Sequence, residues 1–291
     1  RLATVDALAT LPIAGRVFHE IFGMRKDVGE VTLAMAEQER AARASWPAQF
    51  GYALAPHTVY TLHPDVLRAI LARCRAGGAR TSLHLAEHAA ERAYLETGQG
   101  AFHEWVRTRG GSPVDWPAPG CDAIAYAEQL GALGPDVIAV HLADARAPEL
   151  AQLVAAGSPV VLCPRSNLHI ELKLPPLHDI LRAGIRPGLG TDSLASNSSL
   201  DPLAEARALH KRFPTTQPLE LIAMTTAWGA AVLGLSRVLG RIEPGAHPGV
   251  LGFIHGPAAP SDPARFVLEQ ERAERRVLSR PPYQRLSAVF Q

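Results

Sequence analysis

The sequence is poor in cysteine and has no long hydrophobic run. Its three cysteines, Cys74, Cys121 and Cys163, lie far apart and form no CxxC pair. This spacing favours reduced structural thiols over a disulfide framework. No apolar stretch approaches the roughly 20 residues that cross a bilayer, and the first residues contain no secretory hydrophobic segment. We therefore expect a cytoplasmic protein that is not embedded in a membrane.

The chain also lacks an excess of charge of either sign. Among 291 residues, 29 are Lys or Arg and 28 are Asp or Glu, so the formal net charge is +1. This balance gives no electrostatic reason to expect binding to nucleic acid or to an anionic membrane. A small-molecule substrate remains as the expected partner. The sequence leaves the oligomeric state open, with a homodimer as one alternative.

What the sequence does contain is an alternation of strand-like apolar runs with helix-like segments. Hydrophobic residues make up 47% of the chain, enough for a sizeable core. Val17–Phe18 is a weak strand candidate, and five stronger runs cover residues 50–55, 81–85, 137–141, 159–163 and 186–190. Strands that alternate with helices indicate βαβ units and a parallel sheet. The length allows one large α/β barrel or two smaller domains.

Five short segments, in a fixed order, carry polar residues of the kind that hydrolytic metal sites use. Each segment follows a short apolar run. The polar residues are His57, His84 with Glu87, His141, Arg165 with Ser166 and Asn167, and Asp192. In a parallel barrel the C-terminal strand ends open into one mouth, where these residues would meet. Strand alternation also places His141 on the same face as Ala139 and Val137. The ordered series is the main indication of function.

The residue types suit a divalent metal ion and an activated water. His84 and Asp192 can ligate the ion through an imidazole nitrogen and a carboxylate oxygen. The ion would lower the pKa of a bound water to about 7, and Asp192 would take up the released proton. Glu87 can protonate a ring nitrogen or the leaving group. We take Glu87, His141 and Asp192 as catalytic candidates.

Each of these residues also has a structural interpretation. A histidine after an apolar run can be a hydrogen-bonded core residue, Asp192 can cap the following helix, and Glu87 can be a first-turn carboxylate facing a helix dipole. The polar residues 165–167 can simply form an ordinary turn. The order of the whole series favours the functional interpretation. Among the other histidines only His169, expected in a loop beyond the fifth strand end, stays open, and the rest are interpreted as structural.

Longer stretches around these residues resemble the amidohydrolase superfamily. The stretches are APHTVY at 55–60, HLAE at 84–87, His141, PRSNL at 164–168 and GTDSLASN at 190–197. Within it they are similar to the branch of S-adenosylhomocysteine/methylthioadenosine deaminases, aminofutalosine deaminases and triazine chlorohydrolases. The HxxE and GTDS segments together are quite specific. The resemblance runs from about residue 11 to residue 255.

The resemblance implies a (β/α)8 TIM-type barrel to which this chain contributes about strands 3 to 8. Residues 1–235 would form this hydrolase barrel, incomplete at its N-terminus. Residues 236–291 would form a small C-terminal β-subdomain, because Gly240–Gly245 resembles the turn that leads to the family's β-sandwich.

The resemblance further implies deamination of an aminated heterocycle, foremost a modified adenine nucleoside, by metal-bound hydroxide. His84 would be a zinc ligand, and Asp192 a ligand and proton shuttle. His141 would polarise the attacked centre or the hydroxide, and Glu87 would deliver a proton to the heterocycle. His57 would contact the substrate, and so would Arg165, Ser166 and Asn167.

The chain departs from the family's pattern in two places. It contains no HxH pair, which supplies two further metal ligands in the family, and the usual Ala-Asp-Leu after Gly245 is replaced by Ala246–Val250. With only His84 and Asp192 as ligands, we expect this chain to bind zinc weakly or not at all. Two alternatives stay open: a chlorohydrolase or another C–N hydrolase of the same superfamily, and a non-catalytic barrel without metal.

Overall fold

The computed structural model describes residues 2–11, 13–106, 108 and 117–280. The chain divides into two compact units, the first ending at Pro159 and the second beginning at Val160. The predicted boundary at residue 235, between the barrel and the C-terminal β-subdomain, stays a prediction. Among the described residues no helix is long and apolar enough to cross a membrane.

The first unit alternates strands and helices. Its elements are α1 (Val5–Ala9), β1 (Gly15–Ile21), α2 (Lys26–Ala41), β2 (Phe50–Pro56), α3 (Pro64–Ala76), β3 (Thr81–Leu85), α4 (Ala89–Thr97), α5 (Ala101–Trp105), α6 (Ala123–Gln129), β4 (Val137–His141) and α7 (Ala147–Ala156). β1 pairs with β2, and β3 with β4, all in parallel. A parallel bridge between Thr58 and His84 links the β2 and β3 ends. The carboxyl ends of all four strands therefore lie on one side.

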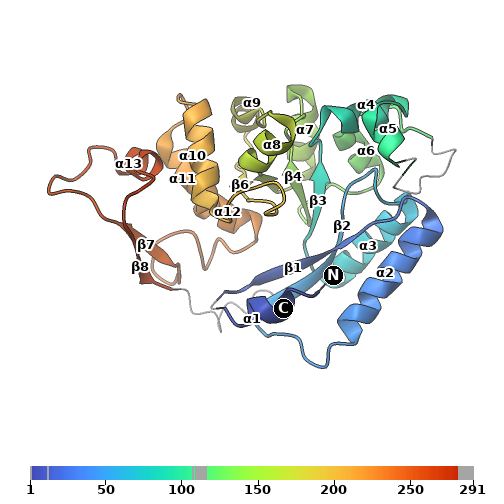
Figure 1. Cartoon of the computed structure of the whole chain (residues 1–291), viewed down its shortest axis with the longest axis horizontal. Coiled ribbons are helices and arrows are strands. Elements are labelled where there is room, and N and C mark those ends of the chain that lie inside the picture. Colours follow the sequence, from blue (N-terminus) through green and yellow to red (C-terminus); the bar gives the residue numbers. More distant parts are fainter. Residues whose placement is uncertain (1, 12, 107, 109–116, 281–291) are drawn as a thin grey trace. The chain divides into compact units, whose positions relative to one another are not determined.

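Helix α3 packs a buried apolar face against β2. Pro64 occupies the first turn, and the ring of His63 accepts a hydrogen bond from the Asp65 backbone N–H at 3.2 Å. Leu67 and Ile70 are completely buried, and each such side chain contributes about 2 kcal/mol through burial. α2 and α3 lie along the same side of the β1–β2 pair (Figure 1).

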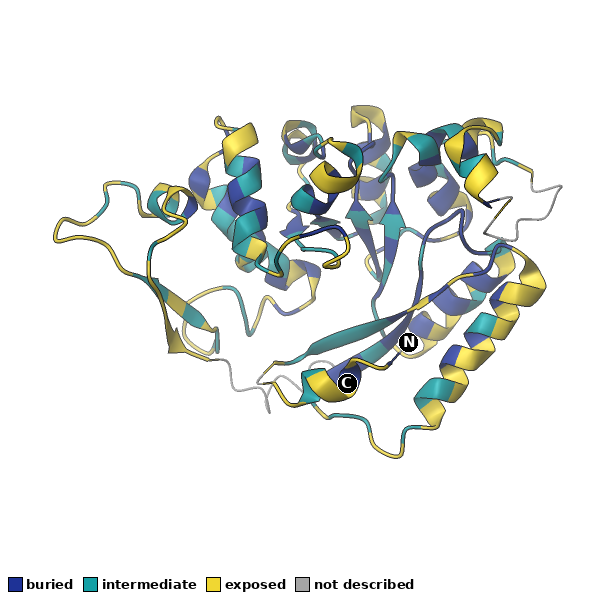
Figure 2. Ribbon diagram, in the orientation of Figure 1, coloured by how far each residue is buried: buried dark blue, intermediate teal, exposed yellow. Residues whose placement is uncertain are grey.

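Helix α2 was not predicted from the sequence. It buries only Gly29, Leu33 and Ala36, and it exposes Val31 and Met35. Figure 2 shows this long exposed face. Because apolar residues lie on both faces, the helical periodicity of this segment is weak.

The second unit contains two pairs of strands and several helices. Its elements are β5 (Val160–Leu162), α8 (Pro164–Glu171), α9 (Leu177–Arg182), β6 (Gly188–Leu189), α10 (Pro202–Arg212), α11 (Pro218–Thr225), α12 (Ala227–Val232), β7 (Val250–Phe253), α13 (Pro263–Glu269) and β8 (Arg275–Ser279). β5 and β6 are parallel, whereas β7 and β8 are antiparallel. The strand expected at 186–190 is shorter, with two residues in β6.

Helix α8 corrects two expectations. His169 lies in this helix and not in a loop, and Arg165–Asn167 form its first turn and not an isolated turn. Pro164 begins the helix because proline fits the first helical position, where no backbone N–H is needed. The segment Gly240–Gly245 is followed by β7, which pairs with β8, and the five residues of β8 are all exposed.

Candidate functional site

In the first unit, the carboxyl ends of β3 and β4 bring two histidines into contact. Nδ1 of His84 lies 2.7 Å from Nε2 of His141, and the two rings stack with centroids 4.9 Å apart. On its other side, Nε2 of His84 lies 3.0 Å from Oε1 of Glu20, at the end of β1. His84 is thus held between an imidazole and a carboxylate.

The contact with His84 occurs together with an unusual backbone angle at His141. Leu85 pairs with His141 in the parallel ladder, so regular alternation would place His141 on the face opposite to His84. The φ angle of His141 is +83°, outside the range of a regular strand. Positive φ in a residue other than glycine costs of order 1–3 kcal/mol and concentrates at functional sites. Ala86, Leu142 and Asp192 also have positive φ.

His57 follows β2 and joins the same group. Its ring centroid lies 5.0 Å from that of His84, and its Nδ1 lies 3.0 Å from Oγ1 of Thr61. Burial, followed by the charge of His84, lowers the pKa of His57 to about 4. The His57 ring is therefore neutral at physiological pH, as a metal ligand or a hydrogen-bond acceptor must be.

The Glu87 carboxylate lies against His141 and His88. Its Oε1 is 3.5 Å from Nε2 of His141, and its Oε2 is 3.2 Å from Nε2 of His88. Burial alone would raise the pKa of Glu87, but the His88 hydrogen bond and the neighbouring imidazoles outweigh it and hold the pKa below its usual range. Glu87 is therefore ionised at neutral pH. His88, interpreted as structural from the sequence, is a further functional candidate because it contacts Glu87.

The carboxylate at the start of α4 is Glu91, so the structural interpretation of Glu87 is wrong. Glu91 accepts hydrogen bonds from the backbone N–H groups of Ala86, Glu87 and His88 at 3.2, 2.7 and 3.4 Å. Glu91 lies three positions after the N-cap His88, which is the capping-box spacing that could have revealed it. Glu91 fixes the backbone that carries Glu87.

A pH-dependent stability follows from Glu91. Complete burial raises the pKa of Glu91 from 4.5 to about 7. Because the folded state then binds more protons than the unfolded state, the free energy of unfolding should fall by up to roughly 3 kcal/mol as pH rises from about 4.5 to 7. Glu91→Gln removes this titration. Thermal melts at pH 5 and pH 8 should show a smaller decrease for Glu91→Gln than for the wild type, and equal decreases would contradict the assignment.

In the second unit, Asp192 is held by two serines. Its Oδ2 accepts hydrogen bonds from Oγ of Ser166 and from Oγ of Ser196, each at 2.7 Å. The following helix, α10, is capped by Asp201, whose Oδ1 accepts from the Leu203 N–H at 3.0 Å. The alternative that Asp192 caps this helix is therefore wrong.

Arg165 supports the same loop from the first turn of α8. The Arg165 side chain donates to Ser199 at 2.8 Å and also to Ser198, and its backbone N–H donates to the buried Glu205 at 2.8 Å. Asn167 is completely buried. These contacts orient the segment that follows Asp192.

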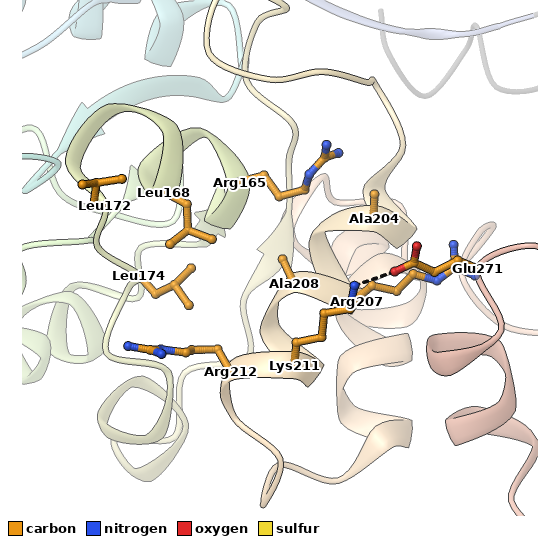
Figure 3. Close-up of a pocket in the computed structure, with 10 residues that line it drawn as sticks. All are labelled: Arg165, Leu168, Leu172, Leu174, Ala204, Arg207, Ala208, Lys211, Arg212 and Glu271. Carbon is orange, nitrogen blue, oxygen red and sulfur yellow. Dashed lines mark hydrogen bonds and ion pairs between the residues drawn. The ribbon is translucent and has the colours of Figure 1, made fainter.

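Arg165 also lines a cavity of about 870 Å³ in the second unit (Figure 3). Leu168 and Leu172 form its apolar wall, while α10 contributes the cations Arg207, Lys211 and Arg212. The Glu271 carboxylate pairs with Lys211 at 2.7 Å. Because cations outnumber carboxylates here, the cavity favours anions over metal ions.

Two groups of side chains among the described residues can hold a metal ion, and both lie in the first unit. One group is Glu20, His57 and His84, and the other is His84, Glu87 and His141; within each group the ligand atoms lie within 4.8 Å of one another. Glu20 was not predicted as a metal ligand because it follows the weakest strand candidate, Val17–Phe18. The roles of all these residues, and the pairing of His84 with Asp192 at one ion, stay predictions.

The sequence model described as the Amidohydrolase family matches residues 16–248. The chain is 34% identical over 227 residues to the 5-methylthioadenosine/S-adenosylhomocysteine deaminase of Nitratidesulfovibrio vulgaris, covering 74% of this chain and 46% of that relative. The chain spans about half the length of the curated relatives it matches.

Two solved structures share the fold. The Helicobacter pylori aminofutalosine deaminase superposes with a TM-score of 0.79 at 20% identity, over 94% of this chain and 69% of that one. The Arthrobacter aurescens atrazine chlorohydrolase, solved with zinc, superposes with a TM-score of 0.70 at 19% identity, over 92% of this chain and 60% of that one. At these identities the similarity establishes the fold and leaves the function to the site.

Proposed function

Since the chain belongs to the amidohydrolase family, we propose that the intact protein is a zinc-dependent hydrolase that deaminates an aminated heterocycle. A modified adenine nucleoside is the foremost substrate class, because relatives that match this chain are named as deaminases of such nucleosides. The proposal includes a (β/α)8 barrel with a small C-terminal β-subdomain, and a cytoplasmic location.

The observation that carries the proposal is the contact of His84, His141 and Glu87. These side chains lie at two neighbouring strand ends. His141 is within hydrogen-bond distance of His84 and within ion-pair distance of Glu87. In the proposal His84 and Asp192 hold the metal ion. When bound, the ion supplies the Lewis acidity that makes water a nucleophile at neutral pH.

The protein side chains would move the protons. Asp192 takes a proton from the water that attacks the amino-bearing carbon, and His141 donates a hydrogen bond at that centre. Glu87, ionised in the resting protein, takes up the second proton of the attacking water and delivers it to a ring nitrogen. The carbon–nitrogen bond then breaks, and the amino group leaves as ammonia once it has taken up the proton from Asp192.

Substrate contacts are assigned to His57, Arg165, Ser166 and Asn167. His57 is the most direct candidate, because its neutral ring lies beside His84. Arg165 and Ser166 would act mainly by orienting the loop after Asp192, since their side chains contact that loop and Asp192 itself. Asn167 lies in the same helical turn.

Release of ammonia tests the proposed reaction against its alternatives. The intact protein, loaded with zinc, is incubated with a panel of adenine-type nucleosides and with chlorinated triazines. We expect ammonia from at least one nucleoside and no chloride from the triazines. Chloride without ammonia would establish the chlorohydrolase alternative, and neither product from a folded, zinc-loaded protein would favour the non-catalytic barrel.

A further inference from the structure

The cavity of about 870 Å³ in the second unit is built by one face of α10 and one face of α8. Residues three or four positions apart share a helix face. The lining residues of α10 recur at that spacing and are Ala204, Arg207, Ala208, Lys211 and Arg212. Arg165, Leu168 and Leu172 do the same at α8. Because the two alanines of α10 are small, the space beside the cations stays open.

Several cations of this cavity act on one carboxylate. Nζ of Lys211 lies 2.7 Å from Oε1 of Glu271 (Figure 3). The hydrogen bond and charge of Lys211 hold the pKa of Glu271 below its usual range, and the charges of Arg207 and Arg165 act in the same direction. The Glu271 side chain is 53% exposed, so it can turn away into solvent. Its carboxylate marks a position at which the cavity stabilises negative charge.

Arg207 is a buried cation whose hydrogen bonds supply no negative charge. Its side chain is 5% exposed, and its Nη2 donates to the backbone carbonyls of Val267 and Gln270 at 2.8 and 3.4 Å. Its Nε is buried and has no hydrogen-bond partner in the part of the chain that the structure describes. Burial, followed by the charge of Arg275, lowers the pKa of Arg207, but arginine stays protonated at neutral pH. An anion beside this cation would therefore be stabilised.

We propose that this cavity binds a small organic phosphate, whose phosphate group displaces the Glu271 carboxylate from Lys211. A ligand carboxylate would gain little there, because Glu271 already supplies one negative charge without immobilising a separate molecule. A phosphate monoester carries about −1.5 to −2 charges at pH 7 and three acceptor oxygens, which suits Lys211 and Arg207 together. The proposal goes beyond the proposed function, because no lining residue serves there as a metal ligand or proton carrier.

The leucines of the cavity favour an organic phosphate over the inorganic ion. Leu168 and Leu172 are exposed, and Leu174 is partly exposed. In Figure 3 the three leucines lie on one side of the cavity and the pair of Lys211 and Glu271 on the other. A ligand with a phosphate at one end and an apolar ring at the other would contact both sides. Covering the leucines removes apolar surface from water and adds to affinity.

Calorimetric titrations of the zinc-loaded intact protein test the class of ligand. The probes are phenyl phosphate, benzoate and inorganic phosphate, so that each of the last two lacks one feature of the first. We expect the dissociation constant of phenyl phosphate to be at least about 10-fold lower than that of either other probe. One charge-assisted hydrogen bond, or two buried methylene groups, contributes an effect of this size.

Three variants locate the binding in this cavity. In Lys211→Gln the dissociation constant of phenyl phosphate should rise about 10- to 100-fold, because a hydrogen bond to a charged group is lost. In Glu271→Gln it should fall about 2- to 5-fold, because the competing surface ion pair is removed. Arg182→Gln is the matched control, since it removes an exposed positive charge of α9 outside the cavity. It should keep the wild-type affinity, and circular dichroism confirms that each variant is folded.

The opposite results overturn the proposal. Phenyl phosphate that does not bind the folded wild type would do so, as would equal affinity for benzoate or inorganic phosphate. Wild-type affinity in Lys211→Gln would place the binding elsewhere, and an equal loss in Arg182→Gln would reduce it to net charge. Unchanged or weaker binding in Glu271→Gln would show that Glu271 does not compete. These readouts are independent of turnover, so an inactive protein that binds phenyl phosphate as proposed would contradict only the deaminase function.

Discussion

Replacing Asp192 with asparagine in the intact protein should lower kcat by about 10²- to 10⁴-fold, the contribution typical of acid–base catalysis. The asparagine amide can neither accept the proton from water nor ligate as an anion. The fold should survive, because Ser166 and Ser196, the partners of Asp192, have hydroxyl groups that can rotate to accept from an amide. Steady-state kinetics of ammonia release and a thermal melt measure the two effects.

Asp201→Asn is the matched control. Asp201 caps α10 and pairs with Arg275 at 2.9 Å, so it serves the helix that Asp192 was alternatively expected to cap. Asparagine remains a good N-cap residue, and we expect kcat to stay at the wild-type value with a small change in melting temperature. If Asp192→Asn behaved like this control, Asp192 would have no part in the chemistry.

Glu87→Gln should also lower kcat by about 10²- to 10⁴-fold, with zinc binding intact. The glutamine side chain keeps the shape of glutamate but cannot carry a proton to the ring nitrogen. The loss should appear mainly in kcat, because a proton delivered only as the transition state forms adds little to substrate binding. Steady-state kinetics on the intact protein, with metal content measured on the same sample, test this prediction.

The melting temperature separates this role from a structural one. The backbone of the α4 N-terminus is capped by Glu91, so Glu87→Gln removes no capping hydrogen bond. We expect only a small change in stability. A clearly lower melting temperature together with unchanged kcat would show that Glu87 supports the helix and not the reaction.

The sequence predicts most strands of the first unit because their patterns are local. Residues 50–55, 81–85 and 137–141 are short apolar runs with clear ends, and β2, β3 and β4 lie at those positions. The polar residues that follow them, His57, His84 and His141, could be grouped because parallel strands present their C-terminal ends together.

What the sequence did not predict depends on register and on backbone geometry. Glu20 reaches His84 because β1 and β2 pair with Glu20 opposite Ala55, and no local pattern contains this register. His141 contacts His84 and has a positive φ, which strand alternation cannot predict. Glu91 has the capping-box spacing from His88, but the first-turn carboxylate expected from the sequence is Glu87.

Oxygen-isotope labelling tests the central claim, hydrolytic deamination, most directly. The zinc-loaded intact protein is incubated with 5′-methylthioadenosine in ¹⁸O-labelled water, and the product is analysed by mass spectrometry alongside a titration of ammonia. The account predicts one equivalent of ammonia and one labelled oxygen on the carbon that carried the amino group. Unchanged nucleoside in the presence of folded, zinc-loaded protein, repeated across the other adenine nucleosides, would contradict it.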